Sequence, residues 1–390
     1  MKALERIDPT VLEQALNTTG ADGWLLYDFH GVNPVARRVI GYEGMVTRRV
    51  FVWLPAQGPP VAIVHSIDAA AVQDFAGKTV VYTTWQELHQ KLETLVTGKR
   101  VAMEVSPGNT VPYVDRVPHG VVELLSGLGA QVLPSDQLVT NFAARWTNAE
   151  LAAHRAAAEI VAEIARSTLE VAVCEAGQVN EIDIQRRVME QFERAGLSVE
   201  DPPIVAFGAH AADPHHNTAQ SGDRALLKDE VILLDLWARG EHAAWADQTW
   251  MGFSGHTPPK EVVDVWDAVT AARDAVVEHL DSACAAGQAI TGASLDRAAR
   301  DLLAKRGYAA EFGHRTGHSI DQDLHGSGPH LDDFETHDVR TLVPGVVFSV
   351  EPGVYLAGRF GVRSEINVIM GDSGPEVTPK VRQTQLFLPT

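Results

Sequence analysis

An apolar run that leads directly into a carboxylate, Val231–Leu234 followed by Asp235, constrains the fold of this chain more than any other feature of its sequence. A second carboxylate, Asp247, follows twelve residues later. Glu241 stands midway between the two, in a turn-prone segment that begins at Arg239. The spacing predicts an antiparallel hairpin in which the two aspartates face each other across adjacent strands.

A second apolar run has the same arrangement. Val346–Val350 ends at Glu351, and Glu365 follows in a run that alternates apolar and polar residues. Gly358 stands midway between the two glutamates, so we expect a second hairpin with a second facing pair. The alternation predicts a half-buried last strand in which Arg363 shares a face with Glu365.

Facing carboxylates repel each other unless a cation lies between them. Four carboxylates on two hairpins are neutralised by two divalent cations, and hard oxygen ligands of this kind suit Mn²⁺, Mg²⁺, Co²⁺ or Zn²⁺. An aspartate that stood alone would more simply be interpreted as the cap of a turn. The two pairs together predict a site for two metal ions.

Histidine is concentrated in two segments rich in Gly, Pro and Asp: of 16 histidines, three fall within residues 210–216 and five within 314–337. Such segments are often solvated surface, so the clustering indicates a site only in combination with the carboxylates. His318 is the best candidate for a nitrogen ligand, because Gly317 beside it lets the backbone and a metal approach closely. His325, seven residues later, is expected to stay unligated near the substrate.

The order of expected elements predicts two domains. At 390 residues the chain is long enough for two to three. The first third alternates short β-rich runs with helical or loop stretches, which is typical of a small α/β domain. Thr147 and Glu150 form the capping-box pattern that opens a long alanine-rich helix. We therefore expect an N-terminal domain over residues 1–143 and a second domain over 144–390.

Composition excludes several classes of partner. The chain has 32 Lys+Arg against 51 Asp+Glu, a net charge of −19, which repels nucleic acid and acidic membrane surfaces. Its N-terminal residues are charged and show no secretory signal, and its apolar runs are shorter than the ~18 residues of a membrane-spanning helix. A cytoplasmic protein without nucleic-acid or membrane partners is the expectation.

The sequence resembles metallopeptidase family M24, the enzymes of the creatinase/aminopeptidase or pita-bread fold, and within it prolidases and aminopeptidases P. The resemblance covers nearly the whole chain. Its motifs occur in the family's order: Pro214-His215, Leu234-Asp235, Ala246-Asp247-Gln248-Thr249, Thr316-Gly317-His318 with His325 seven residues on, Ser349-Val350-Glu351-Pro352-Gly353, and Gly361-Val362-Arg363-Ser364-Glu365.

The resemblance implies an α+β protein, with a C-terminal pita-bread catalytic domain preceded by a smaller α/β domain that serves specificity and dimerisation. It implies that two divalent metal ions are bound, with Asp247 and Glu365 bridging them; the implied ligands are Asp235, Asp247, His318, Glu351 and Glu365. The implied catalytic residues are Glu351, which also takes a proton from the nucleophile, together with His215, His325 and Arg363, which line the substrate site. No other cofactor is implied.

Some positions depart from the family's pattern. The aspartates are usually eleven residues apart and here twelve, which we interpret as one extra residue in the turn. Asp321 adds an acidic group beside the His318 motif, and Trp250 stands where an arginine is common. Many prolidases grip the substrate carboxylate with an arginine after the second histidine, but residues 326–339 contain none before Arg340.

The leading hypothesis is a proline-specific metallo-exopeptidase that cleaves the Xaa-Pro bond with a hydroxide activated by two metals. A prolidase, or Xaa-Pro dipeptidase, is preferred over an Xaa-Pro aminopeptidase (aminopeptidase P), and substrates are Xaa-Pro dipeptides or short peptides. A creatinase-like amidinohydrolase and a non-catalytic binding protein are remoter alternatives, because intact ligands argue against both. Activity is expected with Mn²⁺ or Co²⁺, with Zn²⁺ able to bind, in a homodimer.

Overall fold

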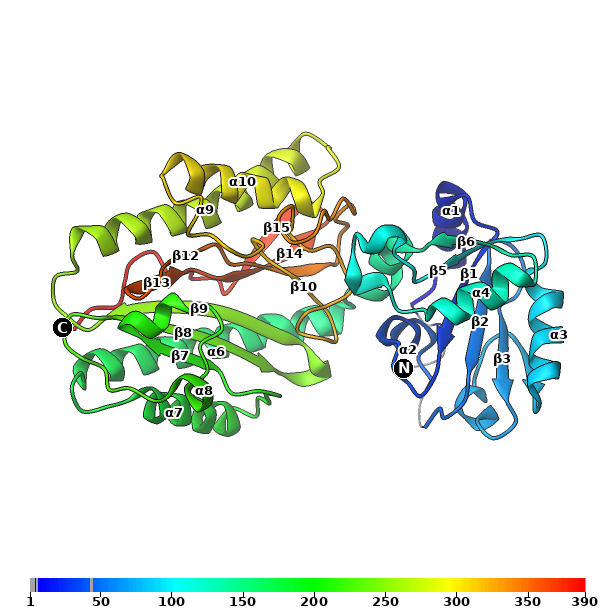
Figure 1. Cartoon of the computed structure of the whole chain (residues 1–390), viewed down its shortest axis with the longest axis horizontal. Coiled ribbons are helices and arrows are strands. Elements are labelled where there is room, and N and C mark those ends of the chain that lie inside the picture. Colours follow the sequence, from blue (N-terminus) through cyan, green and yellow to red (C-terminus); the bar gives the residue numbers. More distant parts are fainter. Residues whose placement is uncertain (1–3, 5, 43–44, 390) are drawn as a thin grey trace. The chain divides into compact units, whose positions relative to one another are not determined.

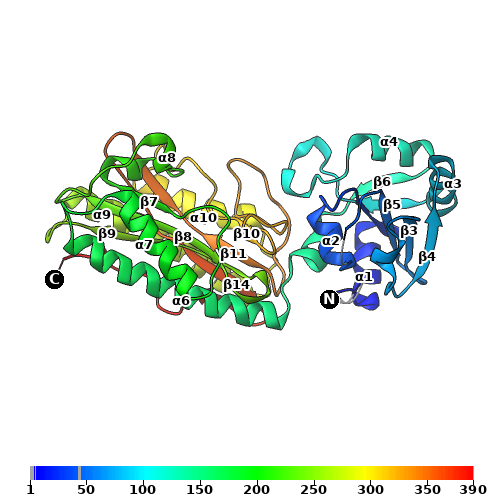
Figure 2. The same cartoon turned by 90° about the horizontal axis from the view of Figure 1, so that it is seen from below.

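The structure is a computed structural model that describes residues 4, 6–42 and 45–389. The chain divides into two compact units, Met1–Ala144 and Arg145–Thr390 (Figures 1 and 2). In the described part of the chain, no helix combines the length and the apolar composition needed to cross a membrane.

A six-stranded mixed sheet forms the centre of the first unit, in the order β4-β3-β2-β1-β5-β6. Its strands are β1 (Gly23–Asp28), β2 (Val50–Pro55), β3 (Val61–His65), β4 (Lys78–Tyr82), β5 (Arg100–Met103) and β6 (Gln131–Pro134). The helices are α1 (Pro9–Thr19), α2 (Pro34–Ile40), α3 (Trp85–Val96), α4 (His119–Gly127) and the short α5 (Asp136–Leu138), which continues as a π-helical turn over Val139–Ala144. The α/β organisation agrees with the sequence pattern, although that pattern did not indicate β6.

Apolar packing on both faces of this sheet explains why its central strand carries no polar stripe. Trp24 and Leu26 of β1 pack into one core cluster, whereas Leu25 and Tyr27 pack into the other. All six residues of β1 are buried. Side chains alternate across a strand, so a sheet covered by helices on both faces needs apolar residues at every position.

Glu104, just after β5, is the buried acid of this unit. Its carboxylate accepts hydrogen bonds from Trp24 Nε1 (2.6 Å), Asn33 Nδ2 (3.1 Å) and Ser135 Oγ (3.2 Å). Burial raises the pKa of Glu104 to about 7 despite these donors. Because the pKa is higher in the folded than in the unfolded chain, the free energy of unfolding is largest below pH 4.5. It falls as the pH rises from 4.5 to about 7, where the unfolded chain ionises more readily than the folded one.

We predict that Glu104→Gln removes this part of the pH dependence. Relative to the unmodified chain, the variant should gain roughly 3 kcal/mol of unfolding free energy between pH 4.5 and pH 8, because each unit of pKa shift corresponds to about 1.4 kcal/mol. Denaturant unfolding at several pH values measures the difference. Glu93→Gln, at an exposed position on α3, is the control and should change nothing. A pH-independent difference for Glu104→Gln would contradict the prediction.

The second unit places strands between two pairs of helices. Long helices α6 (Asn148–Cys174) and α7 (Glu181–Arg194) lie on one side of the strands, and α9 (Lys260–Ala285) and α10 (Gly292–Lys305) lie on the other (Figure 1). The expected capping box is present: Thr147 Oγ1 accepts from the Glu150 N–H, and the Glu150 carboxylate accepts from the Thr147 N–H. A short helix, α8 (Thr218–Ser221), lies in the connection before the first hairpin.

Three sheets make up the strand layer of this unit, with orders β7-β8-β9, β10-β11-β14-β15 and β12-β13. The strands are β7 (Ile204–Phe207), β8 (Val231–Arg239), β9 (Trp245–Phe253), β10 (Ser319–Ile320), β11 (Val347–Val350), β12 (Gly353–Leu356), β13 (Phe360–Arg363), β14 (Ile366–Gly371) and β15 (Gly374–Thr378). The two hairpins expected from the sequence are β8-β9 and the pair formed by β11-β12 with β13-β14.

The first hairpin has a different register from the expected one. Asp235 lies opposite Thr249, and Asp247 lies opposite Trp237, so the two aspartates do not face each other directly. The turn over Glu241–Ala243 is centred one residue later than the spacing suggested. Because the shift moves the pairing by two positions, both aspartates still point to the same face of the hairpin, as diagonal neighbours.

The register of the second hairpin is as predicted. Val354 pairs with Val362 and Val350 pairs with Ile366, so the pairing is symmetric about Gly358. Glu351 and Glu365 occupy the breaks between the paired segments.

The expectation that the last strand is half-buried is wrong, because residues 360–369 are all buried. One face of this run bears Arg363, Glu365 and Asn367 and packs against β9, while Ser364 on the other face accepts a hydrogen bond from Arg273 of α9. The alternation of apolar and polar residues therefore distinguishes the face that packs against β9 from the face directed at α9, and both faces are buried.

Candidate metal centre

Five side chains from the two hairpins and the loop before β10 converge in the second unit. Exposed fractions are 8% for Asp235, 5% for Asp247, 2% for His318 and 4% for Glu365, and Glu351 is half-buried. Strands β8 and β9 and the breaks that follow β11 and β13 hold four carboxylates in the protein interior, where unpaired charges are costly.

His318 occupies the middle of this group. Its Nε2 lies 3.2 Å from Asp247 Oδ2 and 3.6 Å from Glu351 Oε1. Its Nδ1 lies 3.1 Å from the carbonyl oxygen of Ser319, an arrangement that places the proton on Nδ1 and leaves Nε2 free to ligate. One ligand atom each from Asp247, His318 and Glu365 lie within 4.8 Å of one another, as binding to a common ion requires.

Thr249 connects two of the candidate ligands, Asp235 and Glu365. Its hydroxyl donates to Glu365 Oε2 at 2.8 Å and lies 3.4 Å from Asp235 Oδ1, while Arg363 Nε donates to the same hydroxyl at 2.8 Å. Arg363 also forms an ion pair with Asp235 Oδ2. The sequence did not single out Thr249 as a site residue, although its place two residues after Asp247 puts it on the same strand face.

The buried carboxylates fit divalent cations. Asp247 Oδ1 and Glu365 Oε1 are buried and have no hydrogen-bond partner among the described residues. Burial, opposed in part by Arg363, raises the pKa of Asp235 to about 7, and burial followed by the neighbouring carboxylates raises the pKa of Glu365 well above its usual value. Hard cations supply what these oxygen atoms lack, since the ion pair of Arg363 with Asp235 balances one carboxylate of a group of four.

Of the expected substrate residues, His325 lies beside the candidate metal ligands and Arg363 lies among them. The His325 ring packs edge-on to His318 with centroids 4.3 Å apart. The His318 charge, and next burial, lower the pKa of His325 to about 3, so the imidazole is neutral near pH 7. Arg363 Nη1 lies 3.5 Å from the Tyr355 hydroxyl and from the carbonyl oxygen of Pro214.

His215 is exposed, and its backbone N–H donates to Asp213 Oδ1 at 3.0 Å. Its ring is close enough to His325 that its charge contributes to the lowered pKa of that histidine. The loop residues before β8 are thus brought to the same part of the unit as the candidate metal ligands.

The departures from the family's pattern have structural explanations. Asp321 accepts hydrogen bonds from the backbone N–H groups of Asp323 and Ser327, so its carboxylate folds the loop. Arg340 is buried, pairs with Asp338 and donates to two loop carbonyl groups. Trp250 points to the opposite face of β9 from Thr249 and packs in the core beneath α6.

Comparison with known proteins identifies the family. The model of metallopeptidase family M24 matches residues 152–372. The chain belongs to this family. A probable dipeptidase PepE from Mycobacterium tuberculosis is 27% identical over 326 residues, covering 82% of this chain and 80% of the relative.

Solved structures of M24 enzymes share the fold. The dipeptidase PepE from Mycobacterium ulcerans superposes with a TM-score of 0.76 at 23% identity, covering 98% of this chain and 97% of the other. A prolidase from Thermococcus sibiricus gives a TM-score of 0.70 at 24% identity over the full length of both chains. The α+β pita-bread fold is thereby confirmed, and the M24 chain is a peptidase.

Thr249→Val is expected to weaken metal binding without removing a ligand. Valine has nearly the same shape but cannot bond to Glu365 or Arg363, and a hydrogen bond to a charged group contributes about 1.5–3 kcal/mol. We predict a metal affinity lower by roughly tenfold to a hundredfold. Competition with a chromogenic chelator measures it. Thr249→Ser keeps the hydroxyl and should bind metal normally; equal affinity of both variants would refute the role of this hydroxyl.

Proposed function

We propose that this M24 peptidase is a proline-specific exopeptidase, most simply a prolidase that hydrolyses Xaa-Pro dipeptides with two divalent metal ions. The observation that carries the proposal is the convergence of Asp235, Asp247, His318, Glu351 and Glu365 around buried oxygen atoms that have no hydrogen-bond partner among the described residues. All five residue types agree with the family's metal ligands. This argues against a non-catalytic binding protein on the same fold and against a creatinase-like amidinohydrolase.

The proposed mechanism assigns a task to each side chain. When bound, two divalent cations acidify a water molecule and stabilise the charge that develops on the scissile carbonyl. Glu351 accepts the proton of the attacking water. His325 and His215 donate hydrogen bonds to the substrate, for which a neutral imidazole with one N–H is suited. Arg363 orients Asp235 and Thr249 through the contacts described above.

Proline specificity is proposed from the similarity to known peptidases. Those named prolidase and dipeptidase share the fold over almost the entire chain. An Xaa-Pro bond is a tertiary amide without an N–H, so its hydrolysis needs a dedicated pocket. Xaa-Pro aminopeptidase activity is the alternative, because Arg340, the first arginine after His325, is engaged in its own loop and not free to select a dipeptide's carboxylate.

One assay series tests the proposal. The metal-free protein is titrated with Mn²⁺, Co²⁺, Zn²⁺ or Mg²⁺ and assayed on Ala-Pro, Ala-Pro-Ala and Ala-Ala. A prolidase cleaves Ala-Pro preferentially, whereas an aminopeptidase P cleaves Ala-Pro-Ala comparably. Cleavage of Ala-Ala at the same rate as Ala-Pro would refute proline specificity.

The metal assignment is part of the same proposal. Four carboxylates and one imidazole form an oxygen-rich set, so Mn²⁺ or Co²⁺ is proposed for activity, with Zn²⁺ able to occupy the site. Turnover with Mg²⁺ alone that equals turnover with Mn²⁺ would count against this choice.

Assembly and location complete the proposal. We propose a cytoplasmic homodimer in which the N-terminal unit limits substrate length, with residues 33–38 as candidate contacts to a substrate carboxylate. Arg38 of this segment is buried and Arg37 exposed, so Arg37 is the more suitable of its two arginines. Sedimentation with parallel assays on di- and tripeptides tests the idea, and a monomer with full dipeptide preference would contradict it.

A further inference from the structure

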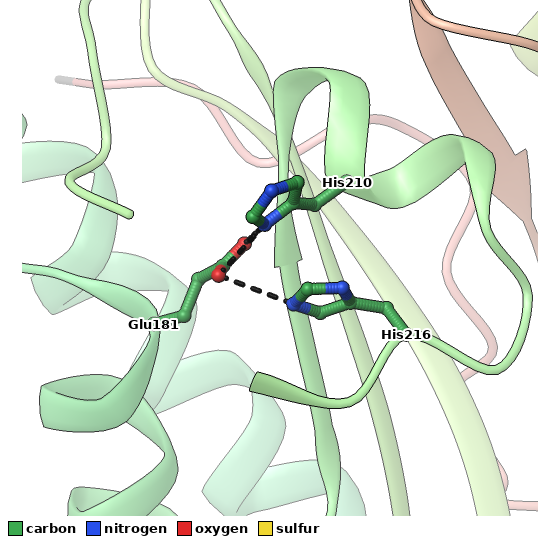
Figure 3. A group of neighbouring side chains, drawn as sticks. All are labelled: Glu181, His210 and His216. Carbon is green, nitrogen blue, oxygen red and sulfur yellow. Dashed lines mark hydrogen bonds and ion pairs between the residues drawn. The ribbon is translucent and has the colours of Figure 1, made fainter. Parts of the chain in front are cut away.

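A second cluster of metal-ligating side chains lies in the same unit and shares no residue with the five ligands above. Glu181 is the first residue of α7, His210 lies in the 3₁₀ turn Gly208–Ala212, and His216 follows in the loop that leads to α8. Figure 3 shows both imidazole rings directed at the Glu181 carboxylate. The sequence pattern did not indicate α7 and hence did not connect Glu181 with the histidines.

The candidate ligand atoms of this cluster are spaced almost as closely as the ligands of one metal ion. His210 Nδ1 lies 3.0 Å from both carboxylate oxygens of Glu181, and His216 Nε2 lies 3.1 Å from Oε2. Ligand atoms at about 2.0–2.1 Å from a tetrahedral ion are separated by roughly 3.3 Å, so a shift of a few tenths of an ångström would accommodate one. The centroids of the two imidazole rings are 4.3 Å apart and the ring planes are inclined by 33°. His210 Nδ1 and His216 Nε2 both face the Glu181 carboxylate.

A buried Glu181 carboxylate is costly unless a positive charge lies beside it. The residue has an exposed fraction of 0%, and its carboxylate also accepts a hydrogen bond from the N–H of Phe207 at 2.9 Å. Arg224 is nearby but forms an ion pair with Glu230 and donates to the Phe207 carbonyl oxygen. A buried carboxylate of this kind is stabilised either by a proton on one of the imidazoles or by a metal ion.

The composition of the cluster favours a different metal from that of the five-ligand site. Two imidazole nitrogens and one carboxylate oxygen form the His₂Glu set typical of Zn²⁺, whereas an oxygen-rich set suits Mn²⁺. The His210 side chain has an exposed fraction of 27%, which leaves space on its side for a water molecule as fourth ligand. We propose that Glu181, His210 and His216 bind one Zn²⁺-class transition-metal ion, separate from the two-metal centre.

Such an ion holds the loop that reaches the metal centre. Residues 208–216 include His215, and the Pro214 carbonyl oxygen lies 3.5 Å from Arg363 Nη1. The loop also packs closely on β13, because a side chain at Gly361 would collide with the carbonyl oxygen of Ala211. The proposed ion therefore anchors α7 to this loop at the point from which it approaches Arg363.

The test counts zinc per full-length chain after equilibrium dialysis against buffered Zn²⁺. His210→Asn is the informative variant, because its side-chain amide can still donate to Glu181 but is a poor zinc ligand. His279→Asn, an exposed histidine on α9, is the matched control. We expect His210→Asn to bind one Zn²⁺ fewer than the unmodified chain, and the control to bind the full number.

The difference of one ion does not depend on the five-ligand site. If that site binds two ions the counts are three and two, and if it binds none they are one and zero. A second measurement guards against misfolding: Zn²⁺ should raise the thermal midpoint of the unmodified chain more than that of a folded His210→Asn variant. Equal zinc counts in a folded His210→Asn variant and the unmodified chain would overturn the proposal and leave a hydrogen-bonded Glu–His–His network.

Discussion

Replacing Asp247 or Glu365 by alanine is expected to abolish metal binding and peptide hydrolysis together. One oxygen of Glu365 accepts a hydrogen bond from Thr249, and one oxygen of Asp247 lies beside His318. The other carboxylate oxygen of each residue is buried and has no hydrogen-bond partner in the described chain. A carboxylate that bridges two cations holds both, and its loss leaves three other carboxylates repelling one another. We expect turnover below detection and, by elemental analysis, two metal ions fewer per chain than in the unmodified protein.

The matched control for these variants is Asp372→Ala, at an exposed turn between β14 and β15, which should leave metal content and turnover unchanged. Circular dichroism confirms that the variants fold. A folded Asp247→Ala protein with the full metal content of the unmodified chain would show that this aspartate is not a bridging ligand.

His325→Ala is expected to keep its metal and lose roughly a hundredfold or more in turnover, the range of one lost hydrogen bond or proton-transfer group in the transition state. The structure places the His325 ring edge-on to His318, and the lowered pKa keeps it neutral, so it has one ring N–H to donate to a substrate. Metal analysis and steady-state kinetics measure both properties on one preparation.

His318→Ala is the comparison that gives this prediction its meaning, because it removes the one imidazole within reach of Asp247 and Glu351 in the described chain. It should lose metal as well as activity. If His325→Ala is as depleted in metal as His318→Ala, the assignment of the nitrogen ligand is wrong.

Local sequence pattern was sufficient to locate most of the elements that build the candidate metal centre. Apolar runs predicted β8, β11 and β14, and the Thr147 and Glu150 pair predicted the start of α6. It was insufficient for the first turn, where His242 adopts a positive φ of 56° and the centre moves by one residue. Turn conformation depends on single residues, so spacing alone could not distinguish facing aspartates from diagonal ones.

The sequence by itself determined which residues are available as ligands, because residue type and order along the strands are local properties that need no knowledge of packing. Only the tertiary structure decided which other side chains these residues contact. Thr249 contacts Glu365 at a sequence separation of 116 residues, and Glu181 contacts His210 from the first residue of a separate helix. Periodicity reports the face on which a side chain lies, whereas such contacts arise when two hairpins and a helix pack together and buried polar groups must find partners.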